Sequence, residues 1–245
     1  MRSFFTIWRR ELNACFLSPI AYVIMVVFLA MSGGTFLLGV DKNVGSDEPL
    51  SNLLFGAVLL WLTVLVPIIS MRLFAEEKRS GTLETLMTAP VTDAEVVLGK
   101  YAGALSFVLI VALPAIAHIF VLAVLSPAID IVTVDPGAVA SGCLVLVLIS
   151  AFFTAIGLMI SLMTGSQIVA AISCFCVLWL CLLAGTLITA LPVDTTRIAQ
   201  FISPLVHVDD FSRGSVDTRP VILYVSGTIF ILFTAVRMLE SRRWK

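Results

Sequence analysis

Two histidines are the residues of this chain best suited to bind a metal ion or to carry a proton. His118 stands alone in a long apolar run, where a packed or interfacial histidine is more common than a proton relay. His207 is followed by Asp209 and Asp210, and these side chains could bind a cation. The pattern favours a simpler role, in which these three side chains cap and solvate a helix on the outer side of a membrane.

The five cysteines do not form a metal-binding or redox pattern. They are Cys15, Cys143, Cys174, Cys176 and Cys181. All of them lie in apolar runs or near the N-terminus, and no histidine or carboxylate accompanies them at the spacing of metal ligands. We expect them to be small core residues that form no disulfide.

Motifs for catalysis and nucleotide binding are missing as well. The only Gly-Lys pair, Gly99–Lys100, lacks the upstream glycines that cradle a phosphate. Neither H-E-x-x-H nor G-x-S-x-G occurs in the sequence. We therefore expect a non-catalytic chain with no cofactor or metal of its own and no nucleic-acid partner.

One short segment concentrates charge in a chain that has only 15 basic and 16 acidic residues among 245. Seven of these charges fall within the 22 positions from Arg72 to Asp93. Leu83, Leu86 and Met87 form an apolar edge at i, i+3, i+4 on a short helix that Pro90 must end. No soluble domain follows that could cover this edge, so the helix suits a groove on another protein. The alternative is a solvated loop packed against the membrane ends.

Long apolar runs must position this segment. The chain is 60% hydrophobic and 13% charged, whereas soluble domains contain about 25% charged residues. Uncharged runs of 18 or more residues are candidate membrane spans. They predict six spans, at about 19–40, 51–72, 100–126, 138–163, 168–191 and 220–238, with a turn at Thr164–Gln167 between the fourth and the fifth. The predicted fold is an all-α membrane protein with a single domain over 1–245.

The lysines and arginines predict how these spans are oriented. Six spans put both termini and the charged segment on one side, which then carries eleven of the fifteen basic residues. Because cytoplasmic loops are enriched in Lys and Arg, that side is expected to be cytoplasmic. We expect a multi-pass protein of the bacterial inner membrane.

Residues 3–16 predict an interfacial helix ahead of the first span. On a helical wheel Phe4, Phe5, Trp8, Leu12, Cys15 and Phe16 share one side, and Thr6, Arg9, Arg10 and Asn13 lie opposite. Ile7 does not fit this pattern. A basic helix with an aromatic side lies in the plane of the membrane surface, which is where we place Trp8, Arg9, Arg10 and Glu11. The alternative is a plain extension of the first span.

Two further helices are predicted outside the bilayer core. Thr92 and Glu95 fit the capping box S/T-x-x-E, so a helix that becomes the third span should begin there. On the other side of the membrane, Ile198, Phe201, Ile202 and Leu205 recur at i, i+3, i+4, i+7. We expect them to form a surface helix that helps to close the outer gate and is broken at Pro204.

The charged segment and its surroundings resemble a known family. The stretch EEKRSGTLETLMTAPVTDAEVVLGKYAGAL, residues 76–105, resembles the ABC-2 type permeases of ATP-binding-cassette transporters. The stretches RREL, SPLVHVDDFSRGSVDTRPVILY and ESRRW resemble the gliding-motility branch of that family, although Pro220 replaces the acidic residue expected there.

The resemblance implies six spans, an interfacial helix and a cytoplasmic coupling helix that docks on a separate ABC ATPase, which binds ATP and Mg²⁺. It implies pairing with a second copy or a related permease and, in the gliding-type branch, a partner with a large periplasmic domain. By motif match the coupling element comprises Glu76, Glu77, Gly81, Thr82, Leu83, Glu84 and Pro90, beside the apolar Leu86 and Met87.

Three functions are compatible with these observations. The first is a permease subunit of an ABC exporter, which moves a substrate when its ATPase hydrolyses ATP. The second is mechanotransmission, in which the complex moves a periplasmic partner and transports nothing. The third, an ion-coupled carrier or channel, requires buried ionisable groups in the spans. The predicted spans offer only His118 for that role, so the sequence favours the exporter.

Overall fold

The structure is a computed structural model that describes residues 2–43, 48–81, 91–125, 135–189 and 201–242. Within these ranges all regular secondary structure is helical, and no described residue lies in a strand. The helices are α1 (Arg2–Leu17), α2 (Pro19–Lys42), α3 (Leu50–Ser70), α4 (Ala75–Ser80), α6 (Asp93–Ala112), the 3₁₀ turn η1 (Leu113–Ile116), α7 (Ala117–Leu125), α8 (Pro136–Met163), α9 (Gln167–Thr189), α11 (Pro204–Ser212) and α12 (Thr218–Arg242).

Six helical segments are long and apolar enough to cross a membrane, which confirms the predicted all-α fold class. They are Pro19–Lys42, Leu50–Ser80, Asp93–Ile119, Pro136–Met163, Gln167–Ala184 and Thr218–Ser241. Each overlaps one of the predicted spans. The third helix begins seven residues before the predicted start at 100, because the helix starts at its cap and not where the charges end.

Local sequence explains where several helices begin and end. Thr92 Oγ1 accepts a hydrogen bond from the backbone N–H of Glu95 (3.3 Å), and the Glu95 carboxylate accepts one from the N–H of Thr92 (3.3 Å), which confirms the capping box. Pro19 occupies the first turn of α2, where its missing N–H costs no hydrogen bond. Gly81 ends α4 with φ of 72°, a conformation that favours glycine.

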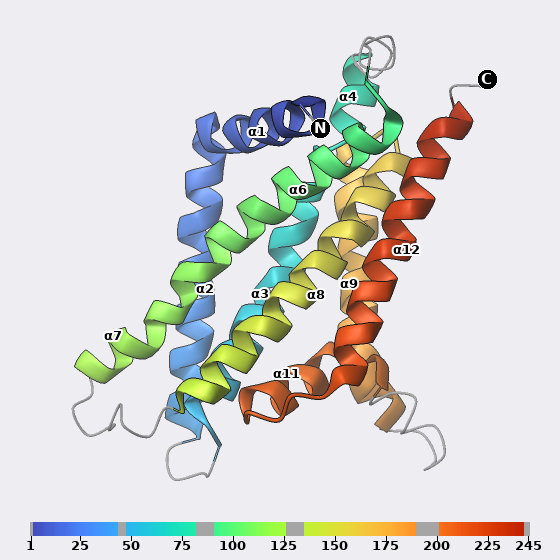
Figure 1. The fold of residues 1–245 in the computed structure, drawn as a ribbon. Coiled ribbons are helices and arrows are strands. Elements are labelled where there is room, and N and C mark those ends of the chain that lie inside the picture. Colours follow the sequence, from blue (N-terminus) through green and yellow to red (C-terminus); the bar gives the residue numbers. More distant parts are fainter. Residues whose placement is uncertain (1, 44–47, 82–90, 126–134, 190–200, 243–245) are drawn as a thin grey trace.

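Figure 1 shows how the helices are arranged. α1 lies across one end of the bundle, at which α4 and the C-terminal end of α12 also lie, whereas α11 lies at the opposite end. α3 and α8 form the centre, with fully buried side chains such as Leu54, Phe55 and Leu62 on α3 and Phe153 on α8. α2, α9 and α12 expose many of their apolar side chains. These exposed faces are suited to contact lipid.

The predicted sides of α1 are largely confirmed, with two exceptions. Phe4, Trp8, Leu12, Cys15 and Phe16 are partly buried, and Thr6, Arg9, Arg10 and Asn13 are exposed. Ile7, the residue that did not fit the wheel, is the most buried side chain of α1 at 7% exposure, whereas Phe5 is 58% exposed. The reason is that α1 packs against α6, where Gly99 and Gly103 let the two helices approach closely. A Cβ atom at Gly99 would lie 2.8 Å from Cγ2 of Ile7. The close approach of α6 therefore accounts for the burial of Ile7.

Candidate functional site

The described part of the predicted coupling element is α4 and the glycine that ends it. Glu76 and Glu77 lie on α4, and Gly81 follows it. Thr82, Leu83, Glu84, Leu86, Met87 and Pro90 lie outside the described residues. The contacts of α4 therefore define the candidate site. α4 and Gly81 immediately precede the segment 82–90.

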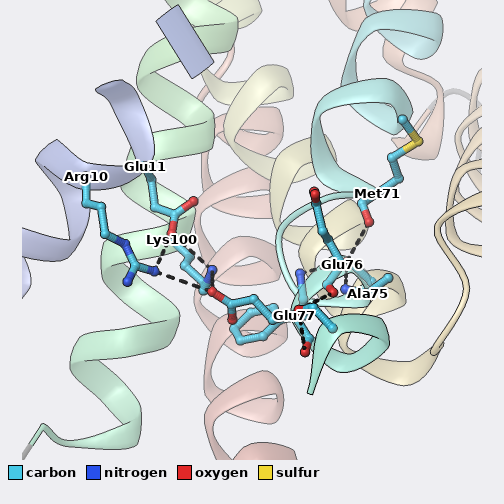
Figure 2. Close-up of polar contacts among 10 residues, drawn as sticks. Arg10, Glu11, Met71, Ala75, Glu76, Glu77 and Lys100 are labelled. Atoms are coloured by element: carbon cyan, nitrogen blue, oxygen red, sulfur yellow. Dashed lines mark hydrogen bonds and ion pairs between the residues drawn. The ribbon is translucent and has the colours of Figure 1, made fainter. Parts of the chain in front are cut away.

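A buried serine of α8 holds the beginning of α4. The backbone N–H groups of Phe74 and Ala75 both donate to Ser161 Oγ, each at 3.1 Å. The same hydroxyl lies 3.4 Å from the Met71 carbonyl oxygen at the end of α3, to which it donates. Figure 2 shows Met71 and Ala75 on the two sides of this contact. Because the first N–H groups of a helix lack partners within it, Ser161 stabilises the α3–α4 junction and attaches it to α8.

A lysine of α4 holds the end of α8 in return. Lys78 Nζ donates to the carbonyl oxygen of Leu162 and to that of Thr164 (3.2 Å). These carbonyls belong to the last turn of α8 and to the residue that follows it. A cation is favoured at this position because unpaired carbonyl groups make a helix C-terminus negative. α4 and α8 are thus connected through the side chains of both helices.

On its other side, α4 joins an ion cluster that also includes α1 and α6. Lys100 Nζ of α6 lies 2.8 Å from Glu77 Oε1 and 3.1 Å from Glu11 Oε1. Arg10 Nη2 lies 3.1 Å from the same Glu11 oxygen and 3.4 Å from the same Glu77 oxygen. The four side chains form an alternating arrangement of two cations and two anions (Figure 2). We call Arg10, Glu11, Glu77 and Lys100 the ion cluster.

Lys100 is the buried centre of this cluster. Lys100 is only 1% exposed, and its ammonium group also lies 5.3 Å from the centre of the Phe74 ring. A lysine is almost never buried unless it is paired, because removing its charge from water is costly. The two carboxylates offset that cost only while α1, α4 and α6 keep their positions. The cluster therefore makes the arrangement of these three helices interdependent.

At the opposite end, polar contacts hold α11 against the bundle. Ser51 Oγ of α3 donates to the Ser212 carbonyl oxygen (2.7 Å), and Ser141 Oγ of α8 donates to that of Phe211 (2.5 Å). His207 is buried, and its Nδ1 lies 2.8 Å from the hydroxyl oxygen of Tyr224 on α12. The prediction that His207 solvates this helix is wrong, because the His207 side of α11 packs against the bundle. Asp210 on the same helix is exposed.

Burial also changes the acid–base properties at this end. It lowers the pKa of His207, and the nearby Asp217 carboxylate opposes the effect only in part. The pKa of Asp210 is raised by its burial and by the carboxylates of Asp209 and Asp217, against the effect of Arg213. Among the described residues no group of three or more potential ligands could hold a metal ion.

The sequence was compared with protein families and with individual proteins. The family model described as ABC-2 family transporter protein matches residues 6–213. This range includes α4, α6, α8, α11 and α1 from Thr6 onwards, and thus the ion cluster. The chain belongs to the ABC-2 family of transporter proteins. No individually curated protein matches the sequence.

The ABC-2 transporter family accounts for the general character of the chain. Its membrane components associate with an ABC ATPase and often form dimers, and they are generally non-catalytic. Six apolar helices together with the family identify the chain as a multi-pass membrane protein. The gliding-motility branch remains a resemblance carried by the motifs alone.

The structure brings only some of the predicted site residues of this ABC-2 transporter together. Arg10, Glu11 and Glu77 meet in the ion cluster, and Trp8 Nε1 donates to Ser106 Oγ of α6 (3.1 Å). Arg9 and Glu76 are exposed. At the other end Phe201 and Ile202 are exposed, Leu205 is partly buried, and Ile198 lies outside the described residues.

Sequence reasoning missed Lys100, Lys78 and Ser161 as functional residues. The sequence shows Lys100 only as part of an incomplete phosphate motif and as one of the basic residues on the side of the charged segment. The available signal was its position, five residues after Glu95, inside a helix that was already predicted to begin at Thr92. A lysine within a membrane helix should be examined for carboxylate partners on neighbouring elements.

The prediction that His118 is a packed residue agrees with the structure, which also shows a stripe of small buried residues on α8. His118 lies against α2, where a Cβ atom at Gly33 would be 2.7 Å from its Nε2, and its Nδ1 is 2.8 Å from the Ala115 carbonyl oxygen. The small residues Ser150, Thr154, Gly157 and Ser161 are buried on α8. A Cβ atom at Gly157 would lie 2.4 Å from the Ser70 hydroxyl, so this stripe permits close packing of α8 and α3.

Proposed function

We propose that this chain is the permease subunit of an ABC exporter, and that α4 and the segment 82–90 couple ATP hydrolysis by a separate ATPase to substrate movement. One observation carries the proposal: α4 is attached on one side to α8 and on the other to α6 and α1. Ser161 and Lys78 provide the first attachment, and Glu77 provides the second.

These attachments suggest how force passes from the ATPase to the spans. A helix of six residues stabilised by contacts at both ends cannot shift without moving its neighbours. A displacement of the segment 82–90 by the ATPase would reach α8 through the backbone contacts of Ser161. It would reach α6 and the interfacial α1 through Lys100. Both spans would then move together relative to the rest of the bundle.

The proposal includes partners and an orientation. ATP and Mg²⁺ bind to the partner ATPase, which is expected in two copies beside a dimer of this chain or a pair with a related permease. The end that carries α1 and α4 is taken as cytoplasmic in the bacterial inner membrane, with both termini, because eleven of the fifteen lysines and arginines belong to that side. A partner with a large periplasmic domain is expected if the resemblance to the gliding-motility branch holds.

Substitution of the apolar edge tests the coupling role. Leu83→Asp would place an unpaired charge in a desolvated contact, at a cost of about 3–5 kcal/mol, which corresponds to a fall in affinity for the ATPase of at least about 100-fold. Copurification of the ATPase and coupled activity in reconstituted vesicles are the measurements. Val216→Asp introduces the same charge into an exposed position at the other end of the bundle and should change neither.

The outcomes separate the possible roles of the segment. Loss of the ATPase with Leu83→Asp, while the variant still inserts and dimerises, supports docking. Wild-type copurification and activity of Leu83→Asp would show that residues 82–90 are only a loop. Mechanotransmission would be favoured over export by a different result. In that case ATP hydrolysis would depend on a periplasmic partner, and no compound would be transported across the vesicle membrane.

A further inference from the structure

A cavity of about 220 Å³ lies beneath α1, at the corner where α1 turns into α2. Its apolar wall includes Ile24 of α2, Ile68 of α3 and Phe107 of α6, and the thiol-bearing Cys15 of α1 also lines it. A single water needs only about 15 Å³ of such space. The cavity therefore has room for a molecular group much larger than water, in contact with three apolar helices.

Charged side chains form the polar part of the cavity lining. Arg72, which follows α3, and Glu76 of α4 are both exposed, and Glu11 of the ion cluster also faces the cavity. Within the described ranges, the side chains of Arg72 and Glu76 form no ion pair or hydrogen bond with each other or with another residue. One guanidinium and one carboxylate are thus available to a guest.

The position of the cavity matches the boundary between the apolar and polar regions of a membrane. α3 ends at Ser70, two residues before Arg72, and the apolar part of α2 begins at Ile20. α1 crosses the bundle at this level with Arg9 exposed (Figure 1). A guest that fits here has a charged group at the rim and hydrocarbon below it, which is the arrangement of a membrane lipid.

We propose that this cavity binds a phospholipid with an ethanolamine headgroup. Its phosphate pairs with Arg72, its ammonium group pairs with Glu76, and the first methylenes of an acyl chain contact Ile24 and Ile68. An anionic headgroup without an amine would satisfy Arg72 but would be repelled by two carboxylates. A quaternary ammonium group cannot donate a hydrogen bond to Glu76. Charge complementarity therefore favours the primary amine.

Bound lipid would also act on the ion cluster, because Glu11 belongs to both. A molecule that binds only the folded arrangement of α1, α2 and α3 stabilises that arrangement. The ammonium group adds a positive charge beside Glu11, the carboxylate that Lys100 and Arg10 already bind. The lipid composition of this leaflet is thereby linked to the position of α1.

Lipid binding by the full-length protein in detergent tests the proposal. Native mass spectrometry would count retained phosphatidylethanolamine, phosphatidylglycerol and phosphatidylcholine, with inorganic phosphate as a competitor. Arg72→Gln and Glu76→Gln should each weaken retention of phosphatidylethanolamine about tenfold, the effect of one charge-assisted hydrogen bond. Arg79→Gln, the same change on an exposed part of α4 outside the cavity lining, should retain as much lipid as the wild type.

Comparison of the three lipid headgroups identifies which lipid is bound. Glu76→Gln should shift the preference towards phosphatidylglycerol, since it removes one repelling carboxylate. Equal retention by Arg72→Gln and Arg79→Gln would overturn the proposal. Preference of the wild type for phosphatidylglycerol or phosphatidylcholine would overturn the ethanolamine assignment. Displacement of the lipid by inorganic phosphate alone would show that the rim is only an anion site.

Alkylation of Cys15 provides a second measurement that does not depend on counting retained lipid. The Cys15 thiol lines the cavity, and its burial and the nearby Glu11 carboxylate raise its pKa, so labelling is done in mildly alkaline buffer. Peptide mass spectrometry then reports modification at this position. Saturating phosphatidylethanolamine should slow the reaction several-fold in the wild type and leave Arg72→Gln unprotected. An unchanged rate in the wild type would contradict occupancy of the cavity.

Discussion

Replacing Lys100 by methionine removes the buried cation through which α6 binds the carboxylates of α1 and α4. Methionine has a similar length, so the change deletes the charge with little change in volume. Glu11 and Glu77 then still face Arg10, but its side chain is largely at the surface. Their two oxygens, which both lay within 3.1 Å of the ammonium group, are left to repel each other across the gap.

The expected cost follows from burial and distance. Removing one partner of a buried ion pair destabilises a protein by about 3–5 kcal/mol. The Glu11 and Glu77 side chains are 15% and 17% exposed and Arg10 still faces both, so the lower limit of about 3 kcal/mol applies. For a chain of this size, 1 kcal/mol corresponds to about 2–4 °C in the unfolding midpoint. Lys100→Met should thus lower the midpoint by about 6–12 °C.

Thermal unfolding of the purified protein in detergent measures this effect. The double variant Lys100→Met/Glu77→Gln restores charge balance around Arg10 and Glu11, and it should recover most of the loss. Lys42→Met is the matched control, because Lys42 is exposed at the end of α2. It should change the midpoint by less than about 2 °C, as expected for a surface substitution.

Two results would refute this reasoning. A wild-type midpoint for Lys100→Met would show that the cluster contributes nothing to stability. Additive losses in the double variant would show that Lys100 and Glu77 do not interact, since residues in one ion network must show a coupling energy. A fall in stability accompanied by full ATPase coupling would separate the structural role of the cluster from the proposed transmission.

Acidification from about pH 7.5 to 5.5 should lower the unfolding midpoint, because burial holds the pKa of His207 below its unfolded value of about 6.5. The unfolded chain takes up the proton first, so stability present above that value is lost as the pH falls through it. His207→Gln should flatten the profile. Gly142→Ala should destabilise the bundle by about 1–3 kcal/mol, since its Cβ would lie 2.0 Å from the Phe55 ring, whereas Gly34→Ala meets no atom within 4 Å and should not destabilise it. Cysteine labelling at position 85 should occur only from the cytoplasmic side, and labelling from outside intact cells would contradict the orientation.

The number and approximate bounds of the spans could be predicted from the sequence because they depend on local properties. Run length alone decides whether a helix can cross a bilayer, at about 1.5 Å per residue. The start of α6 at Thr92 and the end of α4 at Gly81 also follow from short motifs, whose hydrogen bonds and dihedral angles involve only neighbouring residues. A helix over residues 3–16 is predicted for the same reason, and α1 spans Arg2–Leu17.

The side of each helix that would be buried could not be predicted with the same success. The sequence predicts most of the buried side of α1, but Ile7 is buried as well because Gly99 of α6 leaves room for it, and Phe5 is exposed. His207 likewise has the sequence context of an exposed helix, and its burial results from the position of α12. Periodicity describes one helix, whereas burial depends on its neighbours.

Tertiary structure alone decided the candidate coupling site. Lys100 binds carboxylates that are 89 and 23 positions away, and Ser161 caps a helix 86 positions away, so no local pattern could connect them. A single charge in an apolar chain is equally compatible with exposure and with a paired, buried position. Lys100 can be buried because α1 and α4 approach α6 and bring two carboxylates to its ammonium group. The sequence by itself does not show this pairing between distant residues.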